Sequence, residues 1–242
     1  MLLQVQGLTK GLGNQDILRS LDLSVEAGEA AAVMGPNGAG KTTLLNVIAG
    51  LLVPDGGKVL VQGVNPFEHV KARRHIGFIP VDGFAYDHLN AVENLEMLLS
   101  LYQVKKSRSH ILEVLDEVGL SEADVRKSVG TYSSGMKQKL TFASGVIHQP
   151  QLLMLDEPFN ALDLGATRRF QSLLHSLLQQ GRGILFTSHL PETILPLANR
   201  VLLLNEGTMV DELQLDDRVD VPYLQEWYHK RTALITQESQ YG

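Results

Sequence analysis

The sequence predicts an α/β fold with a mostly parallel sheet, an N-terminal antiparallel β subdomain and an inserted helical lobe. Short apolar runs alternate with helix-spaced amphipathic segments, which is typical of a parallel sheet covered on both faces. Residues 1–28 instead alternate apolar and polar side chains, as antiparallel strands do. Residues 82–148 interrupt the strand–helix alternation with apolar side chains at helical spacing.

The expected elements follow from these patterns and from turn residues between them. In chain order they are antiparallel strands in 1–28 around a loop at 11–14, a strand at 30–34, a helix at 44–50, a turn at 54–57, strands at 59–61 and 75–79, helices within 82–148, a strand at 152–155, a helix at 167–180, a strand at 183–187, a hairpin over 201–210 and a helix at 219–232.

We expect one domain over residues 1–232. Its core comprises about 1–81 and 149–215, and the helical lobe is about 82–148. A short C-terminal helix at about 219–232 and a polar, frayed tail at 233–242 complete the chain.

Bulk composition excludes several classes of protein. The net charge of −6 argues against a nucleic-acid binder, and the absence of cysteine excludes disulfides, thiolate catalysis and cysteine-based zinc sites. The N-terminus lacks the pattern of a signal peptide, and no apolar run approaches the roughly 20 residues that span a bilayer. We therefore expect a cytoplasmic protein whose membrane association, if any, comes through a partner.

Residues 35–43 carry the strongest local signal. They satisfy the pattern G-x-x-x-x-G-K-[ST] between an expected strand and an expected helix, as a phosphate loop requires. Glycines let backbone N–H groups approach phosphates, and the helix N-terminus adds partial positive charge. Lys41 is placed to reach the β- and γ-phosphates, and the Thr42 hydroxyl to bind Mg²⁺. The nine residues, which predict a P-loop NTPase core, are Gly35, Pro36, Asn37, Gly38, Ala39, Gly40, Lys41, Thr42 and Thr43.

Two carboxylates follow the apolar strand at 152–155. Asp156 is placed to hold the Mg²⁺ shell, and Glu157 lies at the strand tip, where the γ-phosphate is expected. A carboxylate in that place can polarise or position an attacking water molecule. The phosphate loop upstream favours this interpretation over a surface turn.

The segment Tyr132-Ser133-Ser134-Gly135-Met136 opens a helix 20 to 24 residues before Asp156. With the motifs above, it makes the chain resemble the nucleotide-binding subunit of ABC transporters, whose signature at this place is usually Leu-Ser-Gly-Gly-Gln. Ser133 and Gly135 match that signature, and the departures are similar to variants in the exporter-type branch. The alternative is a helix N-cap serine without a ligand.

The resemblance implies further roles. In the family, the signature residues contact the nucleotide of the opposite subunit, so Ser133 and Gly135 would complete a site across a dimer. Asn160-Ala161-Leu162-Asp163 resembles the loop along that dimer seam, and Asp163 also suits a helix N-cap. His189 matches the switch histidine, which would contact the γ-phosphate and help to hold Glu157 and the water.

Two departures from the family pattern concern base binding and coupling. Leu12 stands where the family usually has an aromatic that stacks on adenine. Val81 stands where a glutamine usually reaches the Mg²⁺ or water and relays nucleotide state to the membrane subunit. Asp82 is a possible substitute by a shift of one residue.

The resemblance therefore implies an ATPase, with ATP and Mg²⁺ as cofactors, that powers a separate transmembrane subunit. Two such subunits, identical or different, would close over two nucleotides on the inner face of the cell membrane. The signature and the short chain after residue 215 favour an exporter. The alternatives are a degenerate nucleotide-binding subunit with a structural or regulatory role, favoured by Leu12 and Val81, and a soluble ABC ATPase that does not serve transport.

Overall fold

A computed structural model describes residues 1–83, 85–160 and 162–241, with side chains described up to residue 233. Its elements, in chain order, are β1 (Leu3–Leu12), β2 (Gln15–Val25), β3 (Ala30–Met34), α1 (Lys41–Ile48), β4 (Gly56–Val61), the 3₁₀ segment η1 (Val70–His75), β5 (Ile76–Ile79), α2 (Ala91–Leu101), α3 (Arg108–Glu117), the 3₁₀ turn η2 (Val129–Thr131), α4 (Ser134–Val146), β6 (Leu152–Asp156), α5 (Leu164–Gln179), β7 (Gly183–Thr187), α6 (Pro191–Ile194), β8 (Arg200–Asn205), β9 (Thr208–Gln214) and α7 (Val221–Tyr241).

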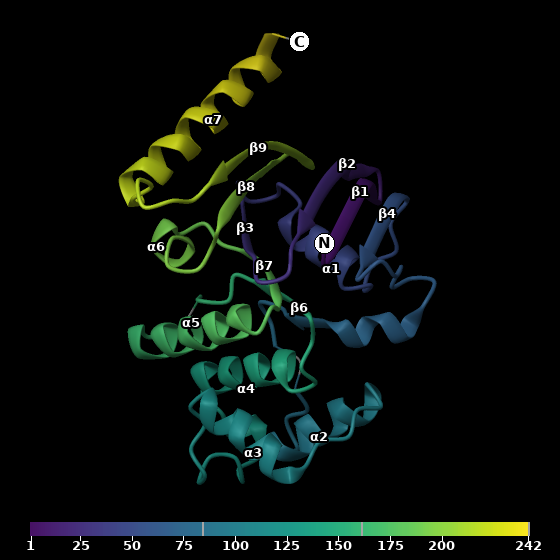
Figure 1. The fold of residues 1–242 in the computed structure, drawn as a ribbon, viewed down its shortest axis with the longest axis vertical. Coiled ribbons are helices and arrows are strands. Elements are labelled where there is room, and N and C mark those ends of the chain that lie inside the picture. Colours follow the sequence, from purple (N-terminus) through teal and green to yellow (C-terminus); the bar gives the residue numbers. More distant parts are fainter. Residues whose placement is uncertain (84, 161, 242) are drawn as a thin grey trace.

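The strands form two sheets, and the predicted fold class is confirmed. A six-stranded sheet has the order β5-β6-β7-β3-β8-β9, with only β9 antiparallel to its neighbour. The second sheet is antiparallel, with the order β2-β1-β4 (Figure 1). Every residue of β3, β6 and β7 is buried, which accounts for their continuous apolar runs.

Two apolar clusters cover the faces of the six-stranded sheet. One joins it to the α2–α5 helices, and in it Phe142 of α4 stacks on Phe170 of α5 with ring centroids 4.2 Å apart. The other joins it to α1 and to the antiparallel sheet, through residues such as Leu3, Leu45 and Met154. The C-terminal end of β3, which leads toward α1, therefore lies between these two apolar clusters.

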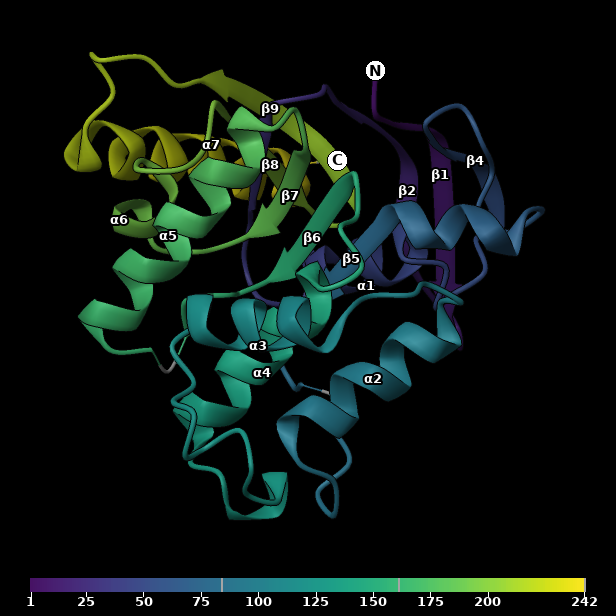
Figure 2. The ribbon, with the colours of Figure 1, turned by 60° about the horizontal axis from the view of Figure 1, so that its bottom comes forward.

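Three helices, α2, α3 and α4, gather at one end of the molecule (Figures 1 and 2). The contact of α4 with β5 is close, because a Cβ on Gly77 would lie 2.2 Å from the carbonyl oxygen of Gly145. Asn90 caps α2 in a reciprocal pair of bonds with Glu93, and Ser133 caps α4. None of the helices in the described part of the chain is long and apolar enough to cross a membrane.

Two expected elements have other bounds in the structure, since β4 begins at Gly56 and α7 ends at Tyr241. The strand expected at 59–61 belongs to the antiparallel sheet, where Val61 pairs with Leu3 and Val59 with Val5. The last helix begins at Val221 and continues to Tyr241, past the expected end at 232 and through most of the expected frayed tail. No glycine or proline follows Pro222 before Gly242, so nothing in the sequence terminates the helix earlier. Gly242 itself lies outside the described residues.

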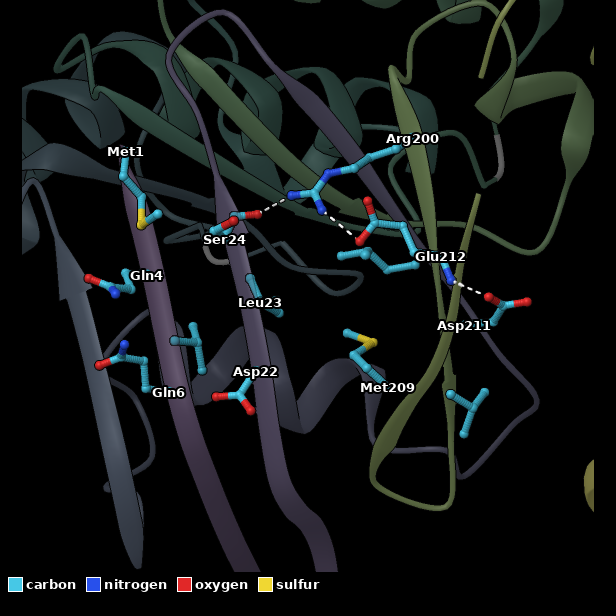
Figure 3. A pocket seen from close by; sticks show the side chains of 13 residues that line it. Met1, Gln4, Gln6, Asp22, Leu23, Ser24, Arg200, Met209, Asp211 and Glu212 are labelled. Carbon is cyan, nitrogen blue, oxygen red and sulfur yellow. Dashed lines mark hydrogen bonds and ion pairs between the residues drawn. The ribbon is translucent and has the colours of Figure 1, made fainter. Parts of the chain in front are cut away.

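A cavity of about 580 Å³ lies between β1 and β2 of one sheet and β8 and β9 of the other (Figure 3). The buried Arg200 spans it: the guanidinium pairs with Glu29 at 2.5 Å and Glu212 at 2.9 Å and donates to the Ser24 carbonyl oxygen. These bonds join the two sheets. Because Arg200 is buried and fully partnered, we assign it a structural role.

Candidate functional site

The phosphate loop follows β3 and leads into α1, which begins at Lys41. Gly40 has φ 105°, a conformation that L side chains rarely adopt. Gly35 has no room for a side chain, because a Cβ there would lie 2.1 Å from the Leu204 carbonyl oxygen. The loop is thus shaped by glycines whose backbone approaches neighbouring segments closely, as a phosphate cradle requires.

The Lys41 ammonium lies over the loop. Its Nζ donates to the carbonyl oxygens of Gly35 at 2.7 Å and Pro36 at 3.1 Å. Partial burial lowers the pKa of Lys41, while the carboxylates of Glu157 and Asp156 act to raise it. A cation so held is available to an anion in the loop.

Asp156 is the centre of a hydrogen-bond network at the ends of β6 and β7. It is buried, and its two oxygens accept from different hydroxyls: Thr42 Oγ1 at 2.7 Å and Thr187 Oγ1 at 2.6 Å. Thr187 Oγ1 in turn accepts from the backbone N–H of Glu157 at 2.9 Å. The network therefore fixes the strand end that carries both carboxylates.

Glu157 is held in an unusual backbone conformation, with φ 47°. Its carboxylate faces His189, whose Nδ1 lies 3.1 Å from both Oε1 and Oε2. The Glu157 side chain is 15% exposed and the His189 ring 57% exposed, so the pair reaches the surface. Strained residues of this kind cluster at functional sites, which favours a role for Glu157 in chemistry.

A cavity of about 310 Å³ unites most of the predicted site. Its lining comprises Ile17, Asn37, Gly38, Gly40, Lys41, Thr42, Thr43, Val81, Asp156 and Glu157. Sequence reasoning did not single out Ile17 or Thr187. Ile17 lies in β2, which belongs to the other sheet, and Thr187 ends an apolar strand, where nothing local distinguishes it from a core residue.

Seven predicted site residues do not line this cavity: Gly35, Pro36 and Ala39 of the phosphate loop, His189 beside Glu157, and Leu12, Ser133 and Gly135. Leu12 is 45% exposed at the end of β1 and does not line the cavity. Ser133 caps α4, its oxygen accepting from Met136 N at 3.3 Å, and Gly135 lies in the first turn. Asp163 caps α5 as expected, with Ala166 N donating to its Oδ1 at 2.7 Å, whereas Ala161 lies outside the described residues.

The donor set fits a nucleotide and its metal. Within the described residues no group of three acidic or histidine side chains converges on one point. The Thr42 hydroxyl and the Asp156 carboxylate do converge, however. Mg²⁺ usually takes one or two protein oxygens, with phosphates and water supplying the rest. Thr42 and Asp156 therefore suit a metal that arrives with a phosphate ligand.

The loop, the strand-end carboxylates and the sheet topology are those of a nucleotide-binding α/β fold with a phosphate loop. A family model described as ABC transporter matches residues 18–160. The ABC transporter ATP-binding protein YdbJ of Bacillus subtilis is 35% identical over 216 residues, covering 88% of this chain and 70% of that protein. The chain belongs to the ABC transporter family of ATP-binding subunits.

Two further relatives are named for the transport of different substrates. The bacitracin transport ATP-binding protein BcrA of Bacillus licheniformis is 36% identical over 218 residues, 89% of this chain and 70% of that protein. The sulfate/thiosulfate import ATP-binding protein CysA of Rhodopseudomonas palustris is 35% identical over 214 residues, 86% and 61%. Among such relatives the chain spans between 55% and 92% of their length.

Solved structures agree with the family. An ATP-binding subunit of an ABC transporter superposes with a TM-score of 0.88 and 28% identity, covering 96% of this chain and all of that one. A dimeric, post-hydrolysis ATP-binding cassette bound to ADP and Pi superposes with a TM-score of 0.81 and 27% identity, covering 88% and 99%. The predicted family is thus confirmed, and the family binds ATP.

Proposed function

We propose that this chain hydrolyses ATP and thereby powers a separate transmembrane subunit that exports a substrate. The observation that carries the proposal is the network from Thr42 through Asp156 and Thr187 to Glu157 and His189. It joins the phosphate loop to a partly exposed carboxylate that a water molecule can reach. Such a carboxylate, fixed next to a phosphate cradle, suits hydrolysis better than binding alone.

Each residue has a part in that reaction. Lys41 would bind the β- and γ-phosphates, while Thr42 and Asp156 would hold Mg²⁺. The metal neutralises charge on the phosphates when bound. Glu157 accepts a hydrogen bond from the attacking water and positions it. His189 holds the Glu157 carboxylate through Nδ1 and contacts the γ-phosphate.

We further propose that two copies, or this chain and a similar one, enclose two nucleotides. Ser133 and Gly135 lie outside the cavity of their own chain, which supports a role toward a second subunit. The helical lobe at 82–148 would carry these residues to the partner's nucleotide. The dimeric form of a solved neighbour supports the same arrangement.

A surface groove of about 250 Å³ supports contact with a membrane subunit. It is lined by Phe78, Pro80, Tyr86, Asn94, Met97, Leu98, Leu101, Tyr102, Thr141 and Ser144. Leu101 is 70% exposed and Tyr86 41% exposed. Exposed apolar side chains that line a groove are typical of a surface that binds a partner. The groove begins next to Val81, which lines the nucleotide cavity. A partner seated there on the inner face of the membrane would sense nucleotide state.

ATP hydrolysis by the purified chain, with and without a co-purified membrane subunit, tests the proposal. We expect Glu157→Gln to bind ATP but to lose activity by about 10²- to 10⁴-fold, because it removes only the water-positioning carboxylate. It should accumulate as an ATP-bound dimer in sizing chromatography. Lys41→Ala should lose ATP binding itself.

The exposed Glu113→Gln on α3 is a matched control and should behave as the unmodified chain does. Nucleotide binding without hydrolysis in the unmodified chain would instead support the degenerate subunit. Uptake or export of a labelled substrate in vesicles decides the direction, which the Tyr132-Ser133-Ser134-Gly135-Met136 signature favours as export.

A further inference from the structure

Two segments of this acidic chain carry positive charge and no carboxylate. Residues 69–75 and 103–110 hold six of the 21 lysines and arginines and none of the 27 acidic residues. The first segment contains η1, and the second joins α2 to α3. They meet in space, since Arg74 Nη2 donates to Gln103 Oε1 at 3.2 Å. We call Lys71, Arg74, Lys105 and Lys106 the basic surface.

The charges of the basic surface are not neutralised. Arg74 donates to the Gln103 amide, and Lys106 donates to the Gln149 amide. Both acceptors are neutral, and no ion pair within the described residues involves any of the four cations. Lys71 and Lys105 are both exposed. The neighbouring Arg108 forms an ion pair with Glu96 and is therefore not part of the basic surface.

One cation of the basic surface, Lys106, also acts on a buried histidine. The buried His148 has its pKa lowered first by burial and further by Arg182 and Lys106. Arg182, at the start of β7, donates to the Pro150 carbonyl oxygen, again a neutral acceptor. Arg182 and Lys106 thus both hydrogen-bond to neutral acceptors.

Exposed apolar side chains accompany the cations. Val70 of η1 is 66% exposed and Leu101 at the end of α2 is 70% exposed. Leu101 and Tyr102 also line the groove assigned to the membrane subunit, and Gln103 follows directly. Cations beside exposed apolar groups match the headgroup region of a bilayer, which offers negative charge and shallow apolar contact.

We propose that the basic surface binds the anionic headgroups of a phospholipid bilayer and holds the groove close to the membrane. The choice of a bilayer rests on the proposed function, because a transmembrane partner places this chain near lipid. An acidic segment of the partner is the competing occupant. The bilayer is favoured because the cations are spread over two elements with apolar side chains among them, which fits an extended surface.

Vesicle sedimentation tests the proposal with the full chain alone, without ATP or partner. We expect binding to vesicles of phosphatidylcholine and phosphatidylglycerol at a 7:3 ratio, and none to phosphatidylcholine alone. Binding should be lost in 0.5 M salt, which screens the attraction. Lys71→Gln/Lys105→Gln should weaken the partition coefficient about 30-fold, since each cation contributes about fivefold. Arg19→Gln/Lys58→Gln, an equal charge change at exposed positions elsewhere, should leave it unchanged.

Equal binding to both vesicle types, or an equal loss in the control variant, overturns the proposal. So does a Lys71→Gln/Lys105→Gln protein that binds vesicles normally yet fails to co-purify with a membrane subunit, because the surface would then serve the partner protein. The assay is independent of hydrolysis. Vesicle binding by a chain without ATPase activity would therefore reject the proposed function and retain this inference.

Discussion

At the scale of single residues, Thr187 holds the two strand-end carboxylates together. It is fully buried, donates to Asp156 Oδ1 and accepts from Glu157 N. The one hydroxyl therefore satisfies a buried carboxylate oxygen and the N–H of a residue at positive φ. Neither bond is replaceable by water without opening the core.

We expect Thr187→Val to lower the free energy of unfolding by about 1–3 kcal/mol, because it leaves buried polar groups unpaired. ATP turnover should fall as well, because Glu157 loses its backbone anchor. Denaturant unfolding and steady-state hydrolysis measure the two effects. Thr187→Ser keeps the hydroxyl and should restore most of both; wild-type stability in the valine variant would contradict the role given to the hydroxyl.

At the scale of elements, the approach of α4 to β5 depends on two glycines. A side chain on Gly77 would collide with the backbone of Gly145 and would lie 2.7 Å from Pro150 Cγ. This contact packs α4, the helix that follows Ser133 of the signature, against β5. The strand ends at Ile79, two residues before Val81.

Gly77→Ala should therefore destabilise the fold by about 1–3 kcal/mol through overpacking. Gly135→Ala in α4 is the matched control for stability, because its Cβ would meet no atom within 4 Å beyond the backbone of its own helix. Chemical unfolding of both variants is the measurement. If the two variants unfold at the same denaturant concentration, the close packing of α4 on β5 is not rigid.

His148 makes the junction of α2, α4 and β5 sensitive to acid. Its ring stacks on Tyr102 with centroids 4.3 Å apart, Nε2 lies 3.0 Å from the Ile76 carbonyl oxygen, and Nδ1 is buried without a partner among the described residues. Burial is the main cause of its lowered pKa, so the fold favours the neutral ring.

As pH falls below about 6.5, the ordinary pKa of histidine, the His148 ring is therefore protonated in the unfolded chain before it is protonated in the folded one. The His148 contribution to stability is therefore present at neutral pH and decreases toward the lowered pKa of the folded state. We expect His148→Phe, which keeps a ring on Tyr102, to reduce the loss of unfolding free energy between pH 7 and 5.5. An identical pH slope in both proteins would assign the acid sensitivity to other groups.

At the scale of the whole molecule, the signature lies apart from the cavity of its own chain. Ser133 is an exposed N-cap and does not line the phosphate-loop cavity. The proposed assembly makes its hydroxyl part of the opposite site, so a bulky cation there should block closure.

Ser133→Arg should abolish most ATP hydrolysis while leaving the ATP affinity of the monomer near normal. Ser107→Arg is a matched control, because Ser107 is likewise the exposed N-cap of a lobe helix, accepting from His110 N at 3.2 Å. Both variants lose about 1 kcal/mol of capping. A comparable loss of hydrolysis in both would indicate that the cap, and not the dimer contact, matters.

The motifs made of contiguous residues could be predicted from local sequence patterns. The phosphate loop at 35–43 needs only glycines, a lysine and a threonine between a strand and a helix, and all of these are neighbours. Asp156 and Glu157 follow an apolar strand directly, and Ser133 and Asp163 are helix caps that short-range patterns predict. The family follows from the order of these motifs.

Contacts between residues distant in sequence became known from the folded structure. Asp156 reaches Thr42 across 114 positions of the chain and Thr187 across 31, and both contacts depend on the order β6-β7-β3 in the sheet. The same long-range pairing put 56–61 in the antiparallel sheet and brought Ile17 of β2 to the cavity. Strand order and register arise from packing of whole layers, which no local window of sequence contains.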